Sequence, residues 1–167
     1  MEVAGSTIYH KTEYRERRNH YAVYSVNHPV NGFDTSRDAF IGLYNSPADP
    51  QAVRKGFCSG SIAHGWAPVA SHHIHLKLRP GDSVSLVFVL GYCENPKDKK
   101  FSAPGVINKE PADRLLARYQ TTEQVMAAFQ ELKILDNASV RLYDSDRRCQ
   151  AEPYGEYMEP VSVHGYI

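Results

Sequence analysis

The sequence has few cysteines and no excess of charge of either sign. Its 167 residues contain only Cys58, Cys93 and Cys149, which form neither a C-x-x-C pair nor the framework of a disulfide-rich domain. Lys plus Arg number 19 and Asp plus Glu number 19, so the formal net charge is zero. Without a basic surplus there is no electrostatic reason to expect nucleic acid or an anionic membrane as a partner. We therefore expect a cytoplasmic protein that binds neither of them.

Long hydrophobic runs are also missing. No stretch approaches the ~20 apolar residues that a membrane-spanning helix requires. Residues 1–10 lack the basic start and the apolar core of a secretory signal. Hydrophobic residues make up 42% of the chain and charged residues 23%, a composition typical of globular proteins. We expect one globular domain, or one domain with an appendage.

Residues 1–93 contain sequence that favours strands. Tyr21–Val26 is rich in β-branched and aromatic residues, and His72–Leu78 alternates between apolar and polar side chains. Val84–Tyr92 is almost continuously apolar, which predicts a strand buried on both faces. The Pro-Gly step within Arg79–Asp82 predicts a turn that joins these last two strands in a hairpin. Two further segments have the composition of loops, residues 31–34 and 44–50. The fold class we expect is mainly β, a partial antiparallel β-sandwich.

Residues 94–133 are predicted to be a linker followed by one or two α-helices. A charged stretch, Glu94–Lys100, precedes Pro111, which suits the first turn of a helix over residues 112–119. Thr121 and Gln124 have the spacing of a capping box, and an apolar stripe follows at helical intervals. The stripe consists of Val125, Phe129 and Leu132. Residues 134–167 show no sustained period, so we expect this third segment not to pack as native structure.

The densest polar segment runs from Tyr9 to Tyr21 and contains Arg15, Arg17 and Arg18 together with Glu13 and Glu16. These charges either form a solvated ion-pair face, or present guanidinium groups that bind phosphate, carboxylate or sugar hydroxyls. Sugar binding would add an aromatic platform, although aromatic residues of a sandwich are also common in its core. The candidate substrate-binding or interface residues are Tyr14, Arg15, Arg17, Arg18 and Trp66.

Other combinations of residues are weaker evidence for a functional site. His73 and His75 would share one face of a strand, but no further metal ligand is placed by the sequence, so we expect no metal site. The pairs Ser61 with His64 and Ser71 with His72 lack a G-x-S-x-G motif. Residues 56–60 lack the ending of a phosphate-binding loop. The acids expected in loops, Asp34, Asp38 and Asp49, are not paired for glycoside hydrolysis. No catalytic residue is assigned.

Five runs of sequence together resemble one enzyme family. They are residues 6–22 (STIYHKTEYRERRNHYA), 32–40 (GFDTSRDAF), 64–68 (HGWAP), 88–92 (FVLGY) and 105–108 (GVIN). Collinear from about Glu2 to Lys133, they resemble the cellobiose phosphorylases of glycoside hydrolase family ninety-four. The resemblance implies the later part of an N-terminal β-sandwich and a helical linker, with the catalytic barrel of paired helices following outside this chain.

The same resemblance implies a reaction. Cellobiose and phosphate give α-glucose 1-phosphate and glucose with inversion, one Asp acting as general acid and phosphate as nucleophile. No metal or organic cofactor is then needed. The parent enzyme would be a homodimer, with Arg15, Arg17 and Arg18 at a domain or subunit interface near the active site. We expect this chain alone to be inactive. The alternatives are a stand-alone carbohydrate-binding module and a complete small enzyme.

The last segment departs from the family pattern. Family members continue after the linker helix with a run like MVNIWNQYQCMVT. Back-translating residues 154–166 and reading one base later permits every residue of that run, and Met158 before Glu159 forces its Trp. Our hypothesis is that residues after about Lys133 are translated in a shifted frame; the alternative is a divergent tail.

Overall fold

The computed structural model describes residues 1–11, 18–136, 142–143 and 149–150. The chain divides into two compact units, Met1–Thr122 and Glu123–Ile167. Helix α4 (Thr122–Asp136) begins at the last residue of the first unit and otherwise belongs to the second. It precedes a short antiparallel pair, β9 (Leu142–Tyr143) with β10 (Cys149–Gln150). No helix among the described residues is long and apolar enough to cross a membrane.

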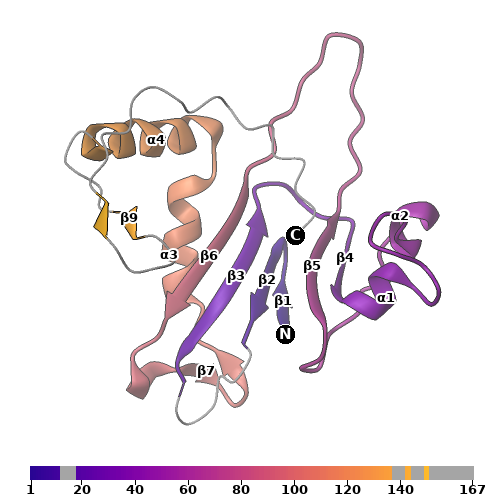
Figure 1. The fold of residues 1–167 in the computed structure, drawn as a ribbon, viewed down its shortest axis with the longest axis horizontal. Coiled ribbons are helices and arrows are strands. Elements are labelled where there is room, and N and C mark those ends of the chain that lie inside the picture. Colours follow the sequence, from indigo (N-terminus) through magenta and orange to yellow (C-terminus); the bar gives the residue numbers. More distant parts are fainter. Residues whose placement is uncertain (12–17, 137–141, 144–148, 151–167) are drawn as a thin grey trace. The chain divides into compact units, whose positions relative to one another are not determined.

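The main sheet of the first unit has four antiparallel strands in the order β1-β2-β3-β6 (Figure 1). Its strands are β1 (Glu2–Ala4), β2 (Thr7–His10), β3 (His20–Val26) and β6 (Phe88–Glu94). The pairing of β3 with β6 is the longest, running in register from His20 opposite Glu94 to Val26 opposite Phe88. Paired residues point to the same side of the sheet, so the register divides the side chains between two faces.

One face of this sheet packs against α3 (Glu110–Leu116), which is followed by η2 (Ala117–Tyr119). The buried core here joins Tyr21 and Val23 of β3 to Ala112 and Leu116 of the helix. Gly91 allows the close approach, because a Cβ at this position would lie 2.5 Å from Leu115 Cδ2. Before α3 the chain forms η1 (Lys97–Lys99), β7 (Phe101–Ala103) and β8 (Val106–Ile107). The hairpin of β7 and β8 also holds the helix, through the fully buried Ile107.

A second, two-stranded sheet pairs β4 (Gly32–Ser36) with β5 (Pro68–His73). Between them the chain forms α1 (Arg37–Ile41) and α2 (Gln51–Lys55) (Figure 1). The rings of His72 and Tyr24 stack at 5.0 Å, which joins this sheet to the other face of the main sheet. Burial lowers the pKa of His72 to about 4, and neither ring nitrogen has a hydrogen-bond partner. The mainly β, antiparallel prediction is confirmed, as are the strand at 21–26 and the helices.

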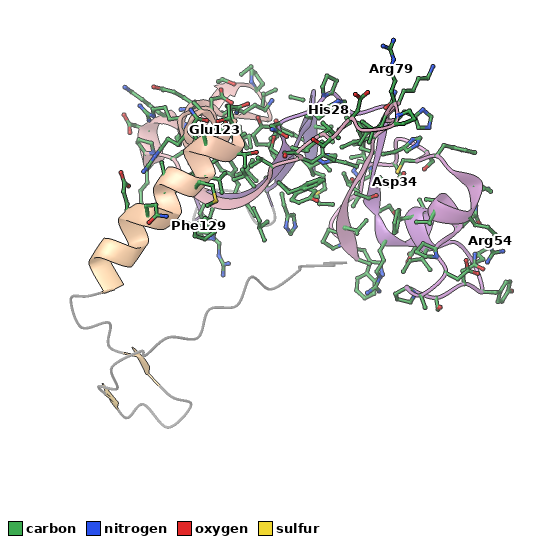
Figure 2. All side chains as sticks on the ribbon, turned by 90° about the horizontal axis from the view of Figure 1, so that it is seen from above. His28, Asp34, Arg54, Arg79, Glu123 and Phe129 are labelled. Carbon is green, nitrogen blue, oxygen red and sulfur yellow. The ribbon has the colours of Figure 1, made fainter. Side chains whose placement is uncertain are left out.

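Three local predictions are wrong. The hairpin across Arg79–Asp82 is absent, because β5 pairs with β4 and β6 pairs with β3, and residues 74–87 form no strand; Arg79 lies at the tip of this segment (Figure 2). The strand at 84–92 is not buried on both faces, since Leu90 and Tyr92 are each 65% exposed. Residues 32–34 belong to β4 and not to a loop. In the first and third cases long-range pairing outweighed local composition.

Candidate functional site

The arginine-rich segment is only partly described. Tyr14, Arg15 and Arg17 lie outside the described residues. Arg18 is exposed and stands two residues before the start of β3. Its neighbour Asn19 donates from Nδ2 to Glu94 Oε1 at 3.1 Å, and the Asn95 amide donates to the Asn19 carbonyl at 2.8 Å. The segment therefore enters the sheet at a fixed point, where β3 begins and β6 ends.

Trp66 is 79% exposed on a turn with unusual backbone geometry. Gly65 has φ +88° and Ala67 has φ +41°, a region that residues with a Cβ seldom adopt. The Arg37 amide donates to the Ala67 carbonyl at 3.0 Å and holds the turn against the end of β4. An exposed indole on a restrained turn is typical of a contact surface. Trp66 precedes β5 and Arg18 precedes β3, so the two candidates belong to different sheets.

A buried carboxylate on β4, whose role the sequence did not reveal, holds the 59–61 segment. Asp34 on β4 is fully buried. It accepts hydrogen bonds from the backbone amides and the hydroxyls of Ser59 and Ser61, the two hydroxyls at 2.6 Å each. Burial alone would raise the pKa of Asp34, but these hydrogen bonds outweigh it and hold the pKa below its ordinary value. The Ser-Gly-Ser spacing at 59–61 was the available signal.

These contacts bear on the acid and hydrolase interpretations of the residues concerned. Asp34 is an ionised structural anchor, since each of its oxygens already accepts hydrogen bonds. The Ser61 hydroxyl donates to Asp34 and not to a histidine. The rings of His73 and His75 meet edge to face at 4.4 Å. Across the part of the chain that the structure describes, no group of three or more His, Cys, Asp or Glu side chains could hold a metal ion.

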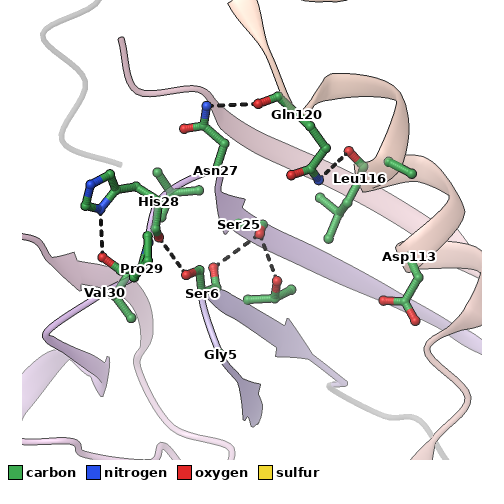
Figure 3. Close-up of a pocket in the computed structure, with 13 residues that line it drawn as sticks. Gly5, Ser6, Ser25, Asn27, His28, Pro29, Val30, Asp113, Leu116 and Gln120 are labelled. Atoms are coloured by element: carbon green, nitrogen blue, oxygen red, sulfur yellow. Dashed lines mark hydrogen bonds between the residues drawn. The ribbon is translucent and has the colours of Figure 1, made fainter. Parts of the chain in front are cut away.

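A pocket of about 690 Å³ opens between the main sheet and the helical segment of the first unit (Figure 3). Its floor is the turn and start of β2 with the end of β3, and its walls are the 27–30 segment, α3 and η2. The polar side chains that line it include Ser6, Thr7, Ser25 and Asp113. Sequence reasoning missed this pocket because it depends on where α3 packs.

The chain is similar to a family model and to two named bacterial enzymes. Residues 1–122 match the family model described as "Glycosyl hydrolase 94, supersandwich domain". An N,N'-diacetylchitobiose phosphorylase from Vibrio furnissii is 32% identical over 104 residues, covering 62% of this chain and 11% of the relative. One from Vibrio proteolyticus is 32% identical over 101 residues, covering 60% and 11%. The matched region thus spans about a tenth of the length of these relatives.

Proposed function

Because this chain belongs to the supersandwich domain family of glycosyl hydrolase 94, we propose that it is the sandwich portion of a disaccharide phosphorylase. The observation that carries the proposal is the family match over residues 1–122. It ends at the residue where the first compact unit, Met1–Thr122, also ends. The proposal therefore concerns a folded unit and not a scattered set of short similarities.

The proposed parent reaction is inverting phosphorolysis of a β-linked disaccharide. A phosphate oxygen attacks C1, the bond from C1 to the glycosidic oxygen breaks, and a carboxylic acid protonates the leaving oxygen. The products are an α-sugar 1-phosphate and a free sugar, and phosphate is the only co-substrate. We propose that the acid lies in the catalytic barrel that the resemblance implies outside this chain. Asp34 itself is an ionised anchor within its own network. Residues 1–167 alone are then inactive.

Cellobiose is the substrate that we propose, on the strength of the five runs that resemble cellobiose phosphorylases. The two Vibrio relatives are named for N,N'-diacetylchitobiose, which differs by an acetamido group on each ring in place of a hydroxyl. Both sugars must therefore be assayed side by side.

We further propose that Tyr14, Arg15, Arg17 and Arg18 lie at a subunit or domain interface near the active site of a homodimeric, cytoplasmic parent. The support is the density of guanidinium groups where the chain enters β3. Arg17→Glu in a full-length relative should lower the dimer fraction or kcat, whereas Arg118→Glu, in η2, should not. Wild-type mass and kinetics for Arg17→Glu would contradict this assignment.

A graft tests the main proposal. The matching stretch of the Vibrio furnissii enzyme is replaced by residues 1–122, and release of sugar 1-phosphate is measured with both disaccharides. The graft should remain active on N,N'-diacetylchitobiose, while the same graft carrying Asp34→Ala should melt at a lower temperature and lose its activity sooner on heating. A graft with native mass and a cooperative melt but no phosphorolysis would overturn the proposal.

The alternative function is a carbohydrate-binding module centred on Trp66, and the 79% exposure of that indole favours it. Trp66 is the only tryptophan in the chain, so fluorescence excited selectively at the indole reports on it alone. Quenching by cellobiose at millimolar concentration, abolished in Trp66→Ala, would support the module. An unchanged spectrum up to about 50 mM cellobiose would remove it, since useful affinities of such sites are millimolar or better.

A further inference from the structure

We propose that the pocket between β2, β3 and α3 binds a pyranose saccharide. The inference goes beyond the proposed phosphorylase function, because it rests on the chemistry of the pocket lining and requires no catalytic barrel. It also differs from the module alternative, since Trp66 does not line this pocket. The volume of about 690 Å³ is within the range of small-molecule sites, roughly 300–1,000 Å³.

The hydroxyl groups of the pocket have their protons committed to the protein. The Ser25 hydroxyl donates to the Ser6 carbonyl at 3.2 Å, so in the 2.8 Å contact between Thr7 and Ser25 the donor must be Thr7 (Figure 3). The Ser6 hydroxyl donates in turn to the His28 carbonyl at 2.6 Å. What the hydroxyls of Ser6 and Ser25 still offer a ligand is therefore oxygen lone pairs.

One carboxylate adds further acceptors. Asp113 of α3 lines the pocket and is exposed, and its side chain makes no ion pair or hydrogen bond with another described residue. It faces the sheet, since its charge adds to the effect of burial in raising the pKa of Tyr9 on β2. In Figure 3 Asp113 lies across the pocket from Ser25. The lining thus combines hydroxyl lone pairs on one side with a carboxylate on the other.

This set of acceptors selects the class of ligand. A phosphate group would be repelled by Asp113 and would find no free hydroxyl proton. A lone ammonium group would satisfy Asp113 but leave most of the volume unfilled. A pyranose carries several hydroxyl donors around its edge and a C–H face that can pack on apolar walls, which Val26, Pro29 and Leu116 supply here.

The pocket rim is held in place before any ligand arrives. Asn27 donates from Nδ2 to the Gln120 carbonyl at 2.9 Å and accepts from the Val87 amide at Oδ1 at 2.8 Å. The Gln120 side chain donates to the Leu116 carbonyl at 2.9 Å. These bonds tie the 27–30 segment to the helical wall and to the chain that enters β6. A preorganised rim reduces the conformational entropy that binding must remove.

Amide chemical shifts of the whole 167-residue chain test the proposal. Titration with cellobiose and with N,N'-diacetylchitobiose should shift amides of residues 5–7, 25–30 and 113–120 with a millimolar Kd. Asp113→Asn, which keeps the shape and removes the charge, should weaken binding at least fivefold. Ala117→Trp, at an exposed position on the wall, should abolish binding by filling the pocket. Matched controls outside the lining are Asp98→Asn and Arg118→Trp, which should bind like the wild type.

Several outcomes overturn the proposal. They are shifts confined to the turn around Trp66, tighter binding of n-butylammonium than of either sugar, and no shift with either sugar at 50 mM. Loss of binding in both control variants would also overturn it. An active graft whose pocket fails to bind sugar would reject this site and leave the phosphorylase proposal standing. Sugar binding in the pocket of an inactive graft would support this site and reject the phosphorylase proposal.

Discussion

Replacing Asp34 by alanine should be the most damaging single change on the second sheet. The substitution leaves the backbone amides of Ser59 and Ser61 without the acceptor that they share at 2.9–3.1 Å. It also frees the two serine hydroxyls, which donate to the same carboxylate at 2.6 Å. Because these residues are 25 and 27 positions from Asp34, the substitution removes the carboxylate part of the attachment between the 59–61 segment and β4. The bonds that Phe33 and Thr35 make with residues 60–63 remain.

The magnitude follows from the bonds that are lost. Hydrogen bonds to a charged group contribute about 1.5–3 kcal/mol each, and an unsatisfied buried donor costs about 1–3 kcal/mol. The serine hydroxyls can turn to water, so the two backbone amides dominate the loss. We expect Asp34→Ala to lower the free energy of unfolding by about 3–5 kcal/mol, and Ser59→Ala by about 1–2 kcal/mol. A domain has only about 5–15 kcal/mol in total.

Acid should reproduce part of this effect. The folded pKa of Asp34 lies below its unfolded value, so its stabilising contribution is complete above the unfolded pKa of about 4. That contribution is lost as pH falls through the folded pKa. The difference in stability between wild type and Asp34→Asn should therefore shrink below pH 4.

Urea unfolding at pH 7, followed by Trp66 fluorescence and by circular dichroism, measures these values. Asp82→Ala is the matched control, because Asp82 is exposed and accepts a single 2.9 Å hydrogen bond from the Arg79 amide. It should cost less than about 1 kcal/mol. A loss below about 1 kcal/mol for Asp34→Ala would refute the anchoring role.

Four further predictions concern the rest of the chain. Gly91→Ala should destabilise the fold by about 1 kcal/mol or more, and Leu115→Ala in the same chain should recover part of the loss; additive losses in thermal melts would contradict the close contact. His72→Phe should preserve the ring stack and remove a loss of stability that the wild type shows as pH falls from about 6.5 toward 4, since the unfolded chain protonates first; parallel pH profiles would contradict this. The exposed apolar side chains of Leu90 and Tyr92 on β6 should cause self-association, which Leu90→Lys should reduce in sedimentation velocity; a monomeric wild type at about 100 μM would refute it. Resequencing the DNA for residues 132–139 should find one base more or fewer, and an unchanged reading would favour the divergent tail.

The sequence predicted elements whose signals are local. The strand at 21–26 follows from β-branched and aromatic residues, and α3 follows from a proline in its first turn. The predicted hairpin across 79–82 is wrong because turn chemistry constrains only four residues, whereas β6 pairs with a strand more than 60 positions earlier. Asp34 looked like a loop residue because the donors that make its burial tolerable lie 25 positions away.

The candidate site shows the same division. Sequence selected Trp66 but left open whether it belonged to the core or to a platform, and its exposure in the structure excludes the core. The pocket could not be predicted at all, because Ser25 and Asp113 face each other only after α3 packs on the sheet. All five candidates stay predictions: Tyr14, Arg15, Arg17, Arg18 and Trp66.

The strand order has a consequence for the speed of folding. Strands β3 and β6 are neighbours, yet Val26 pairs with Phe88, so everything from 27 to 87 is an insertion within one strand pair. Closing a flexible loop of about 60 residues costs about 2 kcal/mol more than closing one of five, a delay of roughly fortyfold. The chain can shorten that loop by first closing β4 on β5. We therefore expect the inserted segment 27–87 to form early and the main sheet to be completed last. Mutations in that segment should then slow refolding more than they accelerate unfolding.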